Sequence, residues 1–318
     1  MLPRLFERFS PGLPPWLPGL PWLPVGRDEL RIFLQPHKLS LLKFKRGIRT
    51  SPLLMEEYPL LPQPGQAAAY GEFWQPAVAS LSQLLQQPQW QGCRPEVVIS
   101  NHFAHYAIIP WNEGISSRDE QGGFVRHCFT QAYGDFARHW DLRFDTPRHG
   151  KPTLASAIDE RLLQSLRLTF EQANMPVRHI HPHLMLAVNS MRRQLKRIPG
   201  LKALALESLI MVMLEDGKLI IALIEQGEWL SLQSYAAEAD IDNQLLALLE
   251  RESVLAGLDT SAWPVVFYAA ETRPALQLAG RDIYNIQHNP LNNTPPLAEP
   301  LAATPTIHNP AMHKKEWH

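Results

Sequence analysis

Cysteine is nearly absent from this chain of 318 residues, which contains only Cys93 and Cys128. Two cysteines cannot build the disulfide framework of a small secreted domain, nor the ligand set of a zinc ribbon. Such sparse use is typical of proteins in a reducing compartment, so we expect a cytoplasmic protein. A chain of this length can bury a large core without covalent cross-links.

The chain also lacks an excess of either charge. Its 30 Lys and Arg residues face 31 Asp and Glu residues, which gives a formal net charge of −1. This balance gives no reason to expect nucleic acid or an anionic membrane as a partner. No apolar run reaches the length of a membrane span. The N-terminus lacks the apolar helix and cleavage site of a signal peptide.

The glycine-rich nucleotide motifs and the Gly-x-Ser-x-Gly nucleophile motif are missing as well. The best metal candidate is the alternation of His179, His181 and His183, because alternate residues of a strand share one face. Pro182 interrupts this run, and a helix predicted to begin at His183 would turn the third ring away. We therefore expect no metal and no cofactor.

A polar segment follows a short apolar strand and contains Ser100, Asn101, His102 and His105. Ser100 could form a nucleophile–base pair with His102 or with His105. No matching carboxylate or oxyanion signal follows, so we expect no catalytic residues. The simpler interpretation is that Asn101 and His102 cap the end of the strand through hydrogen bonds.

Both ends of the chain are rich in proline. Residues 1–26 contain Pro-Trp-Leu-Pro twice, with Trp16 and Trp22 at equivalent positions. Proline at this density blocks helix and sheet and favours an extended path. This leader is predicted to be disordered, with its Trp residues either folding back on the domain or serving as a ligand for a partner's aromatic groove. Residues 288–318 are predicted to form a disordered tail.

Two apolar hairpins organise the region between these ends. One covers about 29–45 around the turn Gln35–Lys38, and a third strand near 48–55 could extend it. The other covers 209–224 around Asp216-Gly217, an ordinary hairpin turn. Strands alternate with helices elsewhere, which predicts mixed or parallel sheets covered on both faces. The expected helices are 73–85, 118–137, 159–172 capped by Asp159, 183–195 and 240–256. The expected strands include 96–100 paired with 105–109, 140–144, 154–158, 177–180 and 263–268. The expected core includes Leu163, Leu166, Ile210, Val212 and Val266.

Two segments carry a resemblance to a known family. Val97–Trp111 is similar to the strand–turn–strand of PilM-like pilus-assembly proteins and of the L-type subunits of type II secretion, and Leu154–Asn189 is similar to a second family segment. The resemblance covers roughly 29–270. It implies a two-lobed actin-like α/β fold, a duplicated ribonuclease H-like architecture with mixed sheets. The expected first lobe with its connecting helices is 27–200, and the expected second, reduced lobe is 201–287.

The sequence departs from the family at the nucleotide loops. ATP-using members carry Asp and Gly in the two hairpin turns, whereas the first turn here is Gln35-Pro36-His37-Lys38. Pro36 removes a backbone donor that a phosphate would need. The L-type subunits usually continue into a membrane helix and a periplasmic domain, and neither is expected here. No catalytic residue of the family carries over, so the turns are degenerate nucleotide loops.

The resemblance therefore implies a cytoplasmic, non-catalytic scaffold or adaptor in type IV pilus or type II secretion assembly, peripheral at the inner membrane. Its expected partners are proteins of the assembly platform, including a membrane-anchored peptide. Two alternatives remain: an ATPase or kinase of the actin-like superfamily with unrecognised phosphate loops, and a stand-alone peptide-binding module.

The candidate partner-binding residues are Arg31, Lys43, Lys45 and Arg46 on the first hairpin, and Trp16 and Trp22 in the leader. An exposed edge hairpin accepts a pairing strand, and basic side chains would select an acidic or phosphate-bearing one. The alternative is a solvated edge that its charges protect from aggregation.

Overall fold

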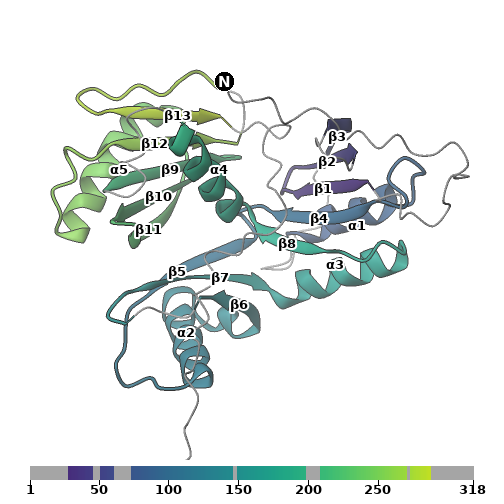
Figure 1. Cartoon of the computed structure of the whole chain (residues 1–318), viewed down its shortest axis with the longest axis horizontal. Coiled ribbons are helices and arrows are strands. Elements are labelled where there is room, and N and C mark those ends of the chain that lie inside the picture. Colours follow the sequence, from purple (N-terminus) through teal and green to yellow (C-terminus); the bar gives the residue numbers. More distant parts are fainter. Residues whose placement is uncertain are drawn as a thin grey trace, which may run out of the picture.

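The computed structural model describes residues 28–45, 51–60, 73–145, 149–197, 208–270 and 273–287. The predicted leader with Trp16 and Trp22, the predicted tail and Arg46 lie outside the described residues. The described chain forms three sheets with helices packed against them (Figure 1). None of the helices described is both long and apolar enough to cross a membrane.

The first five-stranded sheet has the order β3-β2-β1-β4-β8. Its strands are β1 (Glu29–Leu34), β2 (Lys38–Lys45), β3 (Ser51–Pro59), β4 (Arg94–Ile99) and β8 (His179–Pro182). The pairs β1–β2 and β2–β3 are antiparallel. The pairs β1–β4 and β4–β8 are parallel. The apolar residues of one face pack in a cluster with α1 (Gln75–Leu84) and α3 (Glu160–Gln172).

The second five-stranded sheet repeats this arrangement, with the order β11-β10-β9-β12-β13. Its strands are β9 (Leu209–Glu215), β10 (Lys218–Glu225), β11 (Glu228–Ala236), β12 (Val265–Ala269) and β13 (Ile283–Gln287). Helix α5 (Ile241–Ala256) is capped by Asp240, whose side chain accepts from the Asn243 N–H, and the helix packs against this sheet. Each sheet therefore combines an antiparallel three-stranded part with two parallel strands, as expected for the two halves of a duplicated fold.

A third, smaller sheet has the order β5-β7-β6, from β5 (Ala104–Ile109), β6 (Trp140–Phe144) and β7 (Thr153–Asp159). It packs against α2 (Arg118–Tyr133) and the short 3-10 helix η1 (Asp135–His139). The predicted pairing of 105–109 with 96–100 is wrong, because β5 pairs with β7. Strand β4 already has β1 on one side and β8 on the other, so it has no open edge for β5.

One hydrophobic cluster joins the two large sheets. It contains Leu34 and Ile99 from the first sheet together with Met213 and Tyr268 from the second. Helix α4 (His183–Arg197) lies at this boundary, where it contacts β4, β8 and β12 (Figure 1). The predicted core residues are all buried: Leu163, Leu166, Ile210, Val212 and Val266.

The first hairpin is not an edge, contrary to the prediction. Strand β3 pairs along β2, and β1 lies in the middle of the sheet. Arg31 is only 3% exposed, and its Nη2 lies 3.0 Å from Glu96 Oε2. Lys43 Nζ donates to the Gln89 carbonyl at 3.0 Å. Arg31 and Lys43 are thus held by partners within the protein, and of Arg31, Lys43 and Lys45 only Lys45 is exposed.

Replacement of Leu166 tests the predicted buried face of α3. Leu166 is fully buried, so Leu166→Ala should lower the free energy of unfolding by about 2–5 kcal/mol through lost burial and a cavity. Leu168 on the same helix is 56% exposed, so Leu168→Ala should change it by no more than about 0.5 kcal/mol. Urea denaturation measures both. Equal midpoints for the two variants would show that the burial is misassigned.

Candidate functional site

The first lobe is built on the sheet β3-β2-β1-β4-β8, and the second lobe is built on the sheet β11-β10-β9-β12-β13. Residues in the turn after β4 bind the second lobe through hydrogen bonds. At the centre of this turn is Asn101, which is fully buried. Its backbone N–H and its side-chain Nδ2 both donate to Glu215 Oε2, at 3.1 and 2.6 Å. Its Oδ1 accepts from the Tyr106 hydroxyl at 2.6 Å and from the Leu184 N–H at 3.1 Å. Its carbonyl oxygen accepts from Lys218 Nζ at 2.6 Å. One asparagine therefore links β4, β5, α4 and the β9–β10 hairpin.

Glu215, the last residue of β9, carries the negative charge of this junction. Only 1% of its side chain is exposed, and its Oε1 lies 3.1 Å from Nδ1 of His183, the first residue of α4. Burial by itself would raise the pKa of Glu215. The His183 charge, together with hydrogen bonds from His183, the Asn101 N–H and Ser100, outweighs it and lowers this pKa to about 2. Glu215 is therefore ionised at neutral pH inside the protein.

The β9–β10 hairpin is held on both sides of its turn. Lys218 follows the turn and binds the Asn101 carbonyl; burial lowers its pKa, although the Glu215 charge opposes the shift. The His102 ring nitrogen Nε2 lies 3.1 Å from the Asp216 carbonyl oxygen. Because these contacts all cross from one lobe to the other, they close the lobes against each other at this turn.

The first hairpin turn is closed by its own backbone bonds. The Gln35 N–H donates to the Lys38 carbonyl at 3.2 Å, and the Leu60 N–H donates to the His37 carbonyl at 2.7 Å. The second residue of this turn segment, Pro36, has no N–H to donate. Lys38 Nζ lies 3.4 Å from the Glu57 carboxylate. Pro36 therefore supplies no amide to a phosphate at this turn.

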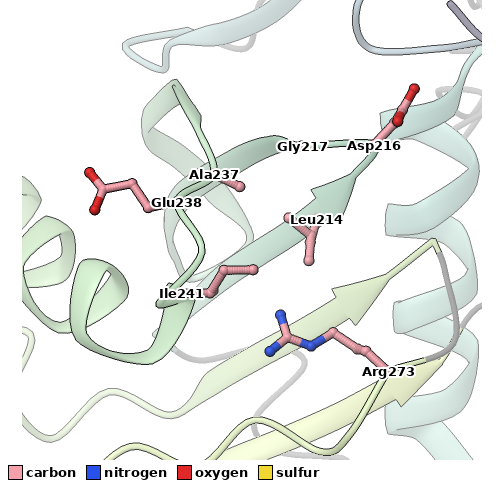
Figure 2. A pocket seen from close by; sticks show the side chains of 7 residues that line it. All are labelled: Leu214, Asp216, Gly217, Ala237, Glu238, Ile241 and Arg273. Carbon is pink, nitrogen blue, oxygen red and sulfur yellow. The ribbon is translucent and has the colours of Figure 1, made fainter. Parts of the chain in front are cut away.

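A small cavity of about 210 Å³ lies beside the second hairpin (Figure 2). Its lining is Leu214, Asp216, Gly217, Ala237, Glu238, Ile241 and Arg273. Figure 2 shows Arg273 extending into this space while the carboxylates of Asp216 and Glu238 point away from it. Arg273 lies 3.8 Å from the Asp242 carboxylate and stacks over Phe267. Because the Asp242 carboxylate already offsets the charge of Arg273, the cavity offers little positive charge to an anion.

The structure does not assemble the Ser100 and histidine pair that catalysis would need. Ser100 Oγ accepts from the His102 backbone N–H at 3.2 Å, while the His102 ring turns to the second lobe. The His105 ring stacks on Trp140 with centroids 4.0 Å apart, and burial lowers its pKa to about 4. The prediction that Asn101 and His102 make hydrogen bonds at the strand end is confirmed, but their main bonds reach the second lobe.

The three alternating histidines are also separated. The rings of His179 and His181 stack 5.4 Å apart on β8, and His181 Nε2 lies 3.6 Å from Glu96. His183 instead faces Glu215. Within the described ranges, no group of three or more His, Cys, Asp or Glu side chains is placed to hold a metal ion.

Sequence reasoning missed Glu215, His183 and Lys218 as a site. The available signal was an acidic residue at the end of an apolar strand, directly before a hairpin turn. This signal does not by itself reveal a buried site, because Asn101, which binds the Glu215 carboxylate, lies 114 residues away in the sequence and His183 lies on another element.

The charge of Glu215 predicts a pH-dependent contribution to stability. Its folded pKa of about 2 lies below the ordinary value of 4.5, so ionisation stabilises the fold fully above that value and progressively less as the pH falls towards 2. Glu215→Gln should lower the free energy of unfolding by about 3–5 kcal/mol at pH 7, because it removes the buried carboxylate that His183 and two Asn101 donors bind. The difference from wild type should shrink between pH 4.5 and 2.

Chemical denaturation from pH 7 downwards measures this difference, with Glu113→Gln at an exposed loop position as control. A Glu215→Gln variant as stable as the wild type at pH 7, or a difference that does not vary with pH, would contradict the assignment.

No family model matches the chain, and no curated protein matches it in sequence. Solved structures do match. The cytoplasmic domain of EpsL, an inner membrane component of the type II secretion system of Vibrio cholerae, has a TM-score of 0.51 at 9% identity, covering 84% of this chain and 92% of that one. A Bacteroides thetaiotaomicron protein with an actin-like ATPase fold has a TM-score of 0.51 at 10% identity, with the same coverages of 84% and 92%.

A chain of the PilM-PilN type IV pilus biogenesis complex has a TM-score of 0.54 at 14% identity, covering 83% of this chain and 89% of that one. Identities this low establish an architecture and not an activity. With its two similar five-stranded sheets closed on a shared core, the chain has the two-lobed, actin-like α/β fold that the sequence resemblance implied.

Proposed function

We propose that this protein is a non-catalytic scaffold or adaptor of a type IV pilus or type II secretion assembly, and that it works without ATP. The observation that carries the proposal is the buried network of Asn101, Glu215 and His183 between the lobes. It occupies the junction at the second hairpin, where ATP-using members of the fold bring Asp and Gly towards phosphates.

The electrostatics of this junction oppose a bound polyphosphate. A phosphate at the second hairpin would approach the ionised Glu215 carboxylate, which is buried and already bound by His183 and Asn101. To open the junction, the two hydrogen bonds from Asn101 to Glu215 would have to break. Breaking one buried charge interaction costs about 3–5 kcal/mol, a large part of the binding energy of a nucleotide. The first turn, with Pro36 in place of a donor, offers nothing to offset that cost.

The scaffold role rests on the kind of proteins that share the fold. One is the cytoplasmic domain of an inner membrane secretion component, and another is part of a pilus biogenesis complex with a second protein. An actin-like chain without phosphate loops fits such an assembly role better than a kinase role. We place it on the cytoplasmic side of the inner membrane, held there by protein partners that include a membrane-anchored peptide, with no nucleic acid involved.

Titration with Mg-ATP tests the absence of nucleotide binding. We expect no heat of binding above that of dilution in isothermal calorimetry with ATP up to the millimolar range. Low-micromolar binding, about −8 kcal/mol, would overturn the proposal and favour the ATPase or kinase alternative. The Glu215→Gln variant, which removes the buried negative charge, provides the comparison: a weak heat seen only in that variant would support electrostatic exclusion.

Affinity capture from native membranes tests the assembly role. The tagged chain should retain inner-membrane proteins of a pilus or secretion apparatus that a matched tagged control protein does not retain, as identified by mass spectrometry. Recovery of metabolic enzymes only, at both low and high salt, would contradict the role.

A further inference from the structure

Strand β3 is an outer edge of the first sheet, since β2 is its only neighbour in the order β3-β2-β1-β4-β8. It is nine residues long, whereas β8 at the opposite edge has four residues and ends at Pro182. Edge strands are commonly protected by shortness, proline or charge. In β3 the prolines stand near the two ends, at Pro52 and Pro59, so the segment between them is open.

The backbone of this segment alternates between β2 and the open side. The Leu60 N–H donates to the His37 carbonyl, which fixes the phase of the antiparallel ladder next to the pair Lys38↔Pro59. Hydrogen-bonded pairs alternate with non-hydrogen-bonded ones. The backbone N–H and C=O of Glu56 therefore form hydrogen bonds with β2, whereas those of Met55 and Glu57 point away from the sheet.

The side chains of this segment leave an apolar surface uncovered. Leu53 is 51% exposed and Met55 is 43% exposed. By contrast, Leu42, the residue of β2 that pairs with Met55, is only 1% exposed. On the edge strand of the second sheet, β11, the most exposed large apolar side chain is Leu230 at 37%. Strands β3 and β11 are equally long, at nine residues, but β3 has the more exposed apolar side chains.

The charge on β3 is acidic. Glu57 accepts from the Ser40 hydroxyl at 3.1 Å and lies 3.4 Å from Lys38, while Glu56 accepts from the Tyr58 hydroxyl. The strand contains these two carboxylates and no Lys or Arg. A strand added beside β3 therefore gains most if it places an apolar side chain opposite Met55 and a basic one opposite Glu57.

We propose that β3 is the docking edge of this protein and that it accepts from a partner protein an extended segment in which an apolar residue and a basic residue stand two positions apart. Main-chain bonds to Met55 and Glu57 would supply affinity, and the side chains would supply specificity. A second copy of this chain fits poorly, because antiparallel pairing centred on Met55 sets Leu53 opposite Glu57. The proposal names the partner class of the proposed scaffold, and it reverses the charge preference expected from the first hairpin.

The test uses the full chain and a labelled synthetic nonapeptide with Val-Thr-Lys at its centre, so that Val and Lys stand two positions apart. We expect saturable binding in fluorescence anisotropy and slower hydrogen exchange at the Met55 and Glu57 amides. Met55→Pro should weaken binding at least tenfold without changing the melting temperature, because the N–H that it removes faces away from β2. Val254→Lys, at a position 80% exposed on α5, removes another exposed apolar side chain and should leave binding unchanged.

Two further peptides separate backbone pairing from charge. A peptide with Glu in place of that Lys should bind at least tenfold more weakly, and an N-methylated form of the Val-Thr-Lys peptide should not bind. Equal binding to wild type and Met55→Pro would overturn strand pairing, and equal binding of the acidic peptide would overturn the basic partner. A dimer that Met55→Pro abolishes would overturn the proposal by assigning the edge to a second copy. Peptide binding without capture of assembly proteins would contradict the scaffold role alone.

Discussion

A carboxylate ionised inside a protein must be surrounded by groups that replace the water it has lost, and Glu215 imposes this requirement on the whole molecule. Its two oxygens are met by His183 from the start of α4 and by two donors of Asn101 from the turn after β4. These groups come from different elements of the first lobe, while Glu215 ends a strand of the second. Satisfying one charge therefore fixes how the two lobes meet.

The same constraint explains why Asn101 is fully buried although it lies in a turn. An asparagine can donate and accept at once, and here its backbone and side-chain polar groups are all used. A serine could not reach the same partners, and an aspartate would add a second negative charge beside Glu215. The contact of Lys218 with the Asn101 carbonyl adds a positive charge on the same side of the hairpin. The lobes are thus closed by polar bonds over a shared apolar core.

Local sequence signals predicted the parts of the fold that depend on neighbouring residues. The Asp216-Gly217 turn and the Asp159 cap of α3 follow from turn and capping chemistry, and both are confirmed. Pairings between distant segments were not predictable in this way. The alternating pattern of β5 shows that it is a strand, but not that β7 is its neighbour. Arg31 was expected on an exposed hairpin, because nothing nearby in the sequence shows that Glu96 lies beside it on β4.

The candidate site shows the same limit for charge. A single acidic residue at the end of a strand, such as Glu215, is common at the start of an exposed turn, so its burial depends on what covers that turn. The residues that cover it are Asn101 and His183, whose own sequence context offered a strand cap and a metal-ligand candidate that the sequence argued against.

A closed junction of this kind has a consequence for the proposed function. If the space between the lobes is filled, partners are left the outer surfaces of the lobes, and an open sheet edge such as β3 offers backbone hydrogen bonds that a folded surface otherwise keeps paired. The proposed absence of nucleotide binding and the proposed docking at β3 would then both follow from one arrangement.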